Sequence, residues 1–147
     1  MTIVRMILAG VLVALLAACS SVPTAQREHD RQAAYAAAAG EPVRSFRFFT
    51  LYSWEPLGDS RLAVYTRPRE AWLLDLGGSC PDLPYANVIA LTSSLHQVSV
   101  HFDKVLTPRR DFPCTISRIR PVDLARLKTV QQAQRVIESQ PRPAVVH

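Results

Sequence analysis

The side chains with the clearest chemical potential in this sequence are its three cysteines, Cys19, Cys80 and Cys114. A thiol can act as a nucleophile, bind a metal ion or form half of a disulfide. Cys19 ends an unbroken run of apolar and small residues, whereas each of the other two lies beside a proline, in SCPDL and DFPCT. An odd number of cysteines in an exported protein leaves one thiol outside the disulfide pairs, so one of the three needs a separate explanation.

The apolar run before Cys19 has the length of a signal peptide and not of a membrane span. It follows Arg5 and covers the 13 residues from Met6 to Ala18. At 1.5 Å per residue a helix of that length measures roughly 20 Å, which is short of the ~30 Å hydrocarbon core of a bilayer. A short positive segment followed by such a run predicts that residues 1–18 are a signal peptide.

The end of this run, Leu16-Ala17-Ala18-Cys19, resembles the lipobox of bacterial lipoproteins. The resemblance implies cleavage before Cys19 and a diacylglycerol on its thiol, and two or three acyl chains would hold the protein firmly on a membrane. Because Ser20 follows, and not Asp, the resemblance also implies the periplasmic face of the outer membrane in a Gram-negative cell. The membrane is therefore the first expected partner. An ordinary signal peptide that is cleaved nearby is the alternative.

If lipid occupies Cys19, the remaining two cysteines form an even pair in an oxidising compartment. A disulfide between Cys80 and Cys114 would close a loop of about 35 residues and contribute on the order of 4 kcal/mol in the chain-entropy model. A zinc site is disfavoured, because two sulfurs without a group of histidines give too few ligands. We therefore predict the Cys80–Cys114 disulfide.

Other side chains with catalytic or metal-binding potential are sparse. His101 and Asp103 share a strand face. A metal site there would need a third ligand, for which Asp75 and Asp111 are candidates. Ser79 follows two glycines, but Cys-Pro comes after it, where a nucleophile elbow requires one more residue and a glycine. We expect no catalytic residues, no metal ion and no cofactor.

The basic residues are the second chemical feature, because the formal charge is +5 and arginine dominates it. Three groups stand out: Arg67 and Arg69 in one predicted turn, Arg109 and Arg110 in another, and Arg118 and Arg120 alternating along a strand. If the two turns meet, their four arginines would form an anion-binding site for phosphate-bearing lipopolysaccharide, lipid headgroups or an acidic protein, and not for nucleic acid. The alternative is a solvated surface with scattered ion pairs. Signal cleavage would remove only Arg5, so the mature chain keeps 16 basic and 12 acidic residues, a charge of +4.

The elements that must position these groups begin after the expected anchor. Residues 19–42 have almost no large apolar side chains, which predicts a flexible, alanine-rich tether. Alanine favours a local helix in QREHDRQAAYAAAA. As a coil this tether would span roughly 25–30 Å and hold the domain clear of the lipid headgroups.

From Val43 the pattern changes to short strands and tight turns, which favour antiparallel hairpins. The predicted strands cover residues 46–54, 61–66, 71–76, 87–93, 97–107 and 114–120. After them, Asp123 as an N-cap and an apolar stripe predict one C-terminal helix against a side or edge of the sheet. The expected fold is mainly β (α+β): about six short antiparallel strands in a curved sheet or small half-open barrel, over residues 43–139. Residues 140–147 are predicted to be a disordered tail.

Four segments occur in a recognisable order along these strands: AWLLDLGGSCPDL, IALTSS, HFDKV and CTISRIRPVD. Together they resemble an uncharacterised family of small exported proteobacterial proteins, known only as a domain of unknown function. The similarity runs from Phe46 to Lys128. It implies export, a paired Cys80 and Cys114 and a compact β-rich domain, and it carries no catalytic or binding residues.

The expected function is that of a lipid-anchored, non-enzymatic binding or structural module of the cell envelope. Besides the membrane, its expected partner is another envelope protein or an anionic envelope polymer. One alternative is a cell-wall hydrolase, which needs two convergent carboxylates or a His–Asp pair in a pocket. Another is a small-ligand carrier, although the interiors of small barrels are normally filled by side chains.

Overall fold

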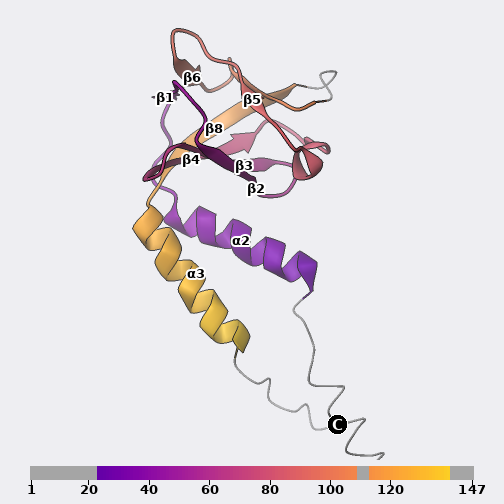
Figure 1. Ribbon diagram of the computed structural model, residues 1–147, viewed down its shortest axis with the longest axis vertical. Coiled ribbons are helices and arrows are strands. Elements are labelled where there is room, and N and C mark those ends of the chain that lie inside the picture. Colours follow the sequence, from indigo (N-terminus) through magenta and orange to yellow (C-terminus); the bar gives the residue numbers. More distant parts are fainter. Residues whose placement is uncertain (1–22, 109–112, 140–147) are drawn as a thin grey trace, which may run out of the picture.

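The computed structural model describes residues 23–108 and 113–139, and over these ranges the fold is mainly β with α+β character. Six strands form one curled antiparallel sheet in the order β2-β3-β4-β8-β7-β5, and β1 pairs with β6 in a two-stranded ribbon (Figure 1). The strands are β1 (Ser45–Arg47), β2 (Ser53–Pro56), β3 (Arg61–Arg67), β4 (Glu70–Leu76), β5 (Ala90–Leu91), β6 (Gln97–Ser99), β7 (Lys104–Leu106) and β8 (Cys114–Val122). The helices are α2 (Thr24–Ala38) and α3 (Leu124–Ser139), with a short 3₁₀ turn, η1 (Leu83–Tyr85). The predicted fold class is confirmed, with eight strands in place of about six.

The central strands are buried on both faces, because successive side chains alternate between two separate cores. In β3, Leu62 and Val64 belong to the core inside the curled sheet, whereas Ala63 belongs to a second core on the outer face. The ribbon packs its inner side onto the first of these cores. Its Phe46 is buried there and stacks on Trp72, with ring centroids 5.0 Å apart.

Helix α2 covers the outer face of the sheet, and this corrects the prediction of a flexible tether (Figure 1). Its Ala34, Tyr35 and Ala38 are buried in one cluster with Ala63 and Ala71 of the sheet. The sequence predicts a tether because large apolar side chains are missing. Small side chains on both partners instead let helix and sheet approach closely, and alanine loses almost no side-chain entropy on burial.

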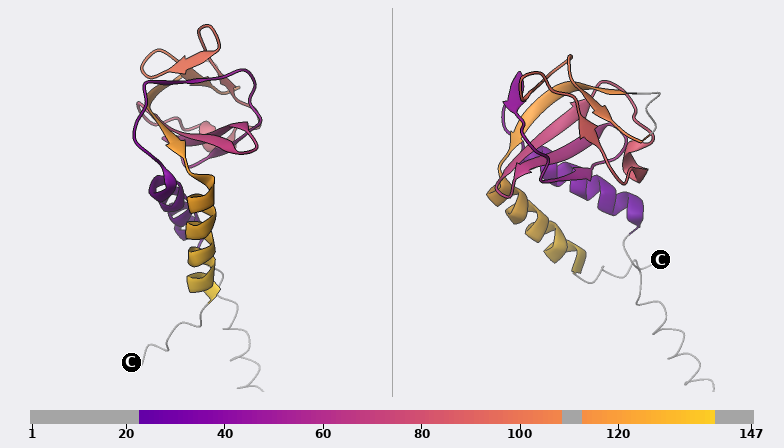
Figure 2. Two further views of the ribbon diagram at one scale, coloured as in Figure 1. Left: turned by 90° about the vertical axis from the view of Figure 1, so that its left-hand side faces the viewer. Right: turned by 45° about the horizontal axis from the view of Figure 1, so that its top comes forward.

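Helix α3 begins where the sequence predicts, after Asp123. One carboxylate oxygen of Asp123 accepts two backbone N–H groups of the first helical turn, both at 3.0 Å. The first turns bury Leu127 in the outer core, and the rest of the helix leaves the sheet and lies along α2 (Figure 2). There Gln134 Nε2 donates to the backbone oxygen of Asp30 at 2.7 Å. The predicted contact of α3 with the sheet is thus limited to its first turns, and α2 covers most of the outer face.

Two predicted strands are each divided in the structure. The expected strand 97–107 becomes β6 and β7, because the chain turns at His101, which has a φ of 66°. The buried carboxylate of Asp103 holds this turn by accepting the backbone N–H of Ser99 and the hydroxyl of Thr92, both at 2.7 Å. The expected strand 46–54 becomes β1 and β2, since its first part pairs with β6 and its last part with β3.

Several predicted features lie outside the described residues. They are the signal peptide, Cys19, the tail of residues 140–147, and Arg109, Arg110 and Asp111 of the loop before β8. These features stay predictions. Neither α2 nor α3 has the length and apolar character that crossing a membrane requires.

Candidate functional site

Three arginines converge on one carboxylate on the outer face of the sheet. Asp75 of β4 pairs with Arg61 Nε and with Arg120 Nη2, each at 3.1 Å. Arg118 Nη1 lies 3.8 Å from the same carboxylate. The side chains of Asp75 and Arg120 are each 16% exposed, whereas that of Arg118 is 58% exposed. We call these four residues the arginine cluster.

Strand register brings the arginine cluster together. Arg61, Asp75 and Arg118 are direct neighbours across β3, β4 and β8. Arg120 lies two residues further along β8, opposite Leu73. Unlike charges that face each other across neighbouring strands stabilise a sheet. The cluster is therefore formed by the strands themselves and not by loops.

A β-bulge in β8 decides which way its arginines point. Asp75 pairs with Arg118 and the next residue of β4 pairs with Ile116, so Ser117 is an extra residue in β8. The Ser117 hydroxyl donates to the backbone oxygen of Asp75 at 3.0 Å. An extra residue interrupts the strict alternation of side chains. Ile116 and Ile119 therefore both lie in the inner core, while Arg118 reaches Asp75 on the outer face.

The arginine cluster has an excess of two positive charges, because three guanidinium groups face one carboxylate. The Nε of Arg120 is buried and has no hydrogen-bond partner among the described residues. Arg44 adds a further positive charge nearby: Val43 pairs with Ile119, which puts exposed Arg44 at the register position opposite Arg118. Guanidinium groups bind phosphate and carboxylate through two parallel N–H bonds. The surface is therefore suited to an anion.

The turn arginines of the predicted anion site are not part of this cluster. Arg67 ends β3 and Arg69 lies in the β3–β4 turn; both are exposed, and Arg67 Nη1 is 3.6 Å from Glu70. This turn is at the opposite end of the hairpin from Arg61 and Asp75, which pair where β3 begins. The other two predicted arginines lie outside the described residues, so a site that joins all four stays a prediction.

Arg118 and Arg120 were singled out from the sequence, whereas Arg61 and the pairing of Asp75 with arginines were not predicted. Counting outward from the β3–β4 turn would pair Arg61 with Leu76, one residue beyond Asp75. An irregularity between Tyr65 and Arg67 shifts the register and brings Arg61 opposite Asp75. The sequence signals this pair only through opposite charges near the start of β3 and the end of β4.

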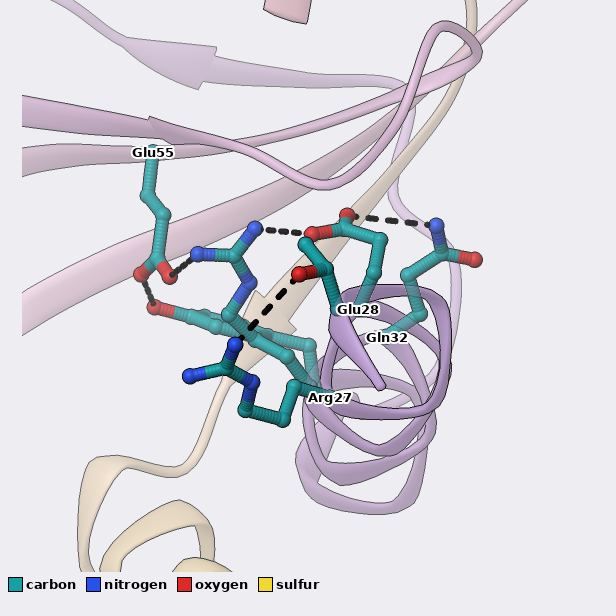
Figure 3. Close-up of polar contacts among 7 residues, drawn as sticks. Arg27, Glu28, Gln32 and Glu55 are labelled. Atoms are coloured by element: carbon teal, nitrogen blue, oxygen red, sulfur yellow. Dashed lines mark hydrogen bonds and ion pairs between the residues drawn. The ribbon is translucent and has the colours of Figure 1, made fainter. Parts of the chain in front are cut away.

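A second polar cluster fastens α2 to strands β2 and β3. The Tyr35 hydroxyl donates to Glu55 Oε2 at 2.5 Å and lies 2.6 Å from the Tyr65 hydroxyl. Arg31 Nη1 is 3.3 Å from the other oxygen of Glu55, and Arg31 also pairs with Glu28 of the same helix (Figure 3). We call Arg31, Tyr35, Glu55 and Tyr65 the α2 latch.

The hydroxyl of Tyr35 is held in its protonated form. Burial, and then the hydrogen bonds with Glu55 and Tyr65, raise the pKa of Tyr35 well above its ordinary value of 10.0. A general base must be able to give up its proton near the working pH. Tyr35 is therefore suited to donating a fixed hydrogen bond, and the α2 latch is a contact that holds α2 in place.

Cys80 and Cys114 lie at disulfide distance, with Cα atoms 6.0 Å apart. This separation is within the ordinary range for bonded cysteines. The pair joins the segment after β4 to the first residue of β8, and Cys80 is buried in the inner core. The Cys80 N–H also donates to the backbone oxygen of Asp59 at 2.7 Å. A cavity of about 290 Å³ opens beside the pair, lined by residues 76–82, 107 and 113–115.

The other residues considered for chemistry lie apart or hold turns. His101 is exposed, whereas Asp103 is buried in the turn between β6 and β7. The Ser79 hydroxyl donates to the carboxylate of Asp59 at 2.6 Å. Across residues 23–108 and 113–139, no three histidine, cysteine or acidic side chains are grouped so that they could hold a metal ion.

Together these features define a small, mainly β domain with a helix on the outer face of its curled sheet. Residues 2–138 match the model described as Family of unknown function (DUF6491). The match spans nearly the whole chain, so the protein belongs to this family. Neither the curated proteins nor the solved structures contain a match.

Proposed function

We propose that this protein is a non-enzymatic binding module of the bacterial cell envelope, anchored by lipid at Cys19 on the periplasmic face of the outer membrane. It binds a phosphate-bearing ligand at the arginine cluster. The observation that carries the binding role is the convergence of Arg61, Arg118 and Arg120 on the single carboxylate of Asp75. Phosphate on an envelope polymer and phosphate in a lipid headgroup both present anionic oxygens to these guanidinium groups.

Support for the anchor comes from the sequence and from the cysteine pair. The apolar run and the LAAC segment resemble the signal peptide and lipobox of a lipoprotein, in which Cys19 would be acylated, and Ser20 follows it. The other two cysteines lie at disulfide distance, which suits a protein exported to an oxidising compartment.

Support for a phosphate ligand comes from charge and preorganisation. A phosphate monoester carries a charge of about −1.5 to −2, which matches the excess of two positive charges in the cluster. Arg61 and Arg120 hold Asp75 closely, so the site is formed before a ligand arrives. Arg118 is the most exposed and the most loosely held of the three, so it can turn toward a ligand at little cost.

The test is calorimetric titration of inorganic pyrophosphate, at low salt, into the mature chain made soluble by Cys19→Ala. The variant Arg118→Gln should bind pyrophosphate about tenfold more weakly, since it lacks one charge-assisted contact. The matched control is Arg69→Gln, which removes the same charge from the turn at the other end of the hairpin. We expect the control to bind as the parent does.

A further variant should change the affinity for pyrophosphate in the opposite direction. Asp75→Asn should bind pyrophosphate more tightly, because it releases the guanidinium groups that Asp75 now occupies. Equal weakening in Arg118→Gln and Arg69→Gln would assign the binding to net charge alone, and no binding by the parent would remove the proposed role. Vesicles with and without phosphatidylglycerol distinguish a lipid headgroup from polymer phosphate.

A further inference from the structure

The start of α2 limits how far the folded domain can stand from a lipid at Cys19. Pro23 is the N-cap of α2, and the helix is docked on the sheet through Ala34, Tyr35 and Ala38. Cys19 precedes Pro23 by four residues, which can span at most about 14 Å in any conformation. The docking of α2 thus removes about half of the reach of roughly 25–30 Å that a coil over residues 19–42 would have.

The end of α3 lies beside the start of α2. The two helices meet at the sheet, where the Asp123 N–H donates to the backbone oxygen of Ala38 at 3.0 Å. Towards their other ends Gln134 bonds to Asp30, and a cavity of about 210 Å³ lies between Arg27 and Glu138. Both helices lie on the side of the sheet opposite the ribbon of β1 and β6 (Figure 1). An anchor just before α2 therefore brings the end of α3 towards the membrane.

The end of α3 carries an exposed apolar pair. Val136 and Ile137 are 59% and 70% exposed, although each is large enough to be stabilised by burial. The charged residues around them and at the start of α2 are Arg27, Arg31, Arg135, Glu28, Asp30 and Glu138, so positive and negative charges balance. A neutral helix end with apolar side chains can approach a lipid surface without electrostatic repulsion.

We infer that the C-terminal half of α3 rests on the lipid surface through Val136 and Ile137, and so fixes the orientation of the domain on the membrane. The inference rests on the proposed lipid at Cys19. Two apolar side chains alone would bind a bilayer weakly. The segment between Cys19 and Pro23 is only four residues long and would keep the end of α3 close to the membrane. The effective concentration of lipid at the helix end is therefore high. The ribbon then faces away from the membrane.

The test uses the full mature lipoprotein, reconstituted in vesicles of phosphatidylethanolamine and phosphatidylglycerol with or without bromine on the acyl chains. Ile137→Trp adds a fluorophore at an exposed position of α3. Leu95→Trp is the matched control, because Leu95 is 99% exposed at the ribbon. Brominated lipid should remove most of the emission that Ile137→Trp adds over the parent, and leave the emission added by Leu95→Trp unchanged.

The outcomes separate the orientation from the anchor. Vesicle flotation and the mass of the peptide that contains Cys19 are measured on the same samples. If the protein floats with acylated Cys19 but Ile137→Trp is not quenched, or Leu95→Trp is quenched as strongly, the orientation is wrong and the anchor stands. If the protein does not float and Cys19 is unmodified, the anchor fails and the orientation fails with it.

Discussion

At the residue scale, Tyr35 combines two roles that hold α2 on the sheet. Its ring is buried in the outer core, at 1% exposure, and its hydroxyl bonds to Glu55 and meets Tyr65. Tyr35→Phe keeps the ring and removes only the hydroxyl. We expect the free energy of unfolding to fall by about 2 kcal/mol, since a hydrogen bond to a charged group is lost. Urea denaturation at pH 7 measures this change.

The same substitution has a signature in the pH dependence of stability. The pKa of Tyr35 is raised in the folded protein, so the stability it contributes is complete below its unfolded value of about 10 and is lost as pH rises from there. The parent should therefore lose more stability than Tyr35→Phe between pH 9 and 11, by up to about 1.4 kcal/mol per pH unit. Tyr85→Phe, at an exposed position, is the control. Parallel curves for parent and Tyr35→Phe would contradict the role given to this hydroxyl.

At the element scale, the decisive feature is that α2 is part of the folded domain. Ala34 is fully buried in the outer core, while its neighbour Ala33 is exposed on the same helix. Ala34→Leu should lower the free energy of unfolding by about 1–3 kcal/mol, because a helix docked through small residues cannot accept a larger side chain. Thermal or urea denaturation measures the loss.

Ala33→Leu is the control for this prediction. Leucine is a good helix former, so helix propensity changes little at either position. We expect Ala33→Leu to have the stability of the parent. If both variants unfold as the parent does, α2 is not docked on the sheet. In that case it would not limit the distance between Cys19 and the domain.

Also at the element scale, two register irregularities create the arginine cluster. One lies between Tyr65 and Arg67 and brings Arg61 opposite Asp75. The other makes Ser117 an extra residue in β8, so that Arg118 faces outward although Ile116, two residues before it, faces inward. A regular alternation of side chains would separate these groups. The arginine cluster therefore depends on two local departures from ideal strand pairing.

At the scale of the whole molecule, the proposed anchor predicts where the protein is found in the cell. Cys19→Ala should move the protein from the membrane fraction to the soluble periplasmic fraction, because it removes the only proposed lipid site. Cell fractionation followed by immunoblotting measures this distribution. Equal membrane retention of parent and variant would contradict the assignment of a lipoprotein.

Cys80→Ala is the matched control for that experiment. It should leave membrane attachment intact and lower the free energy of unfolding by about 2–4 kcal/mol, since it removes the Cys80–Cys114 pair. Reducing agent should lower the stability of the parent but not that of Cys80→Ala. The two cysteine variants thus separate attachment from stability within one protein.

Much of the fold was predictable because its signals are local. Hairpin β3–β4 follows from two short strand patterns around a proline-containing turn, and the start of α3 follows from Asp123 as an N-cap. The prediction of one strand over residues 97–107 was wrong, because a turn held by Asp103 divides it into β6 and β7. That turn depends on Thr92, a residue distant in the sequence, and such a contact leaves no local pattern.

The sequence by itself determined the mainly β fold class, the C-terminal helix and its cap, and the candidate roles of the three cysteines. These depend on residue type and short-range spacing, which a single chain displays directly. Only the tertiary structure decided that α2 belongs to the core and that Arg61, Arg118 and Arg120 meet at Asp75. The physical reason is that both depend on pairings between distant segments. The docking of a helix through alanine requires a matching small-residue surface on the sheet, and the register of strands is set by bulges that no local preference specifies.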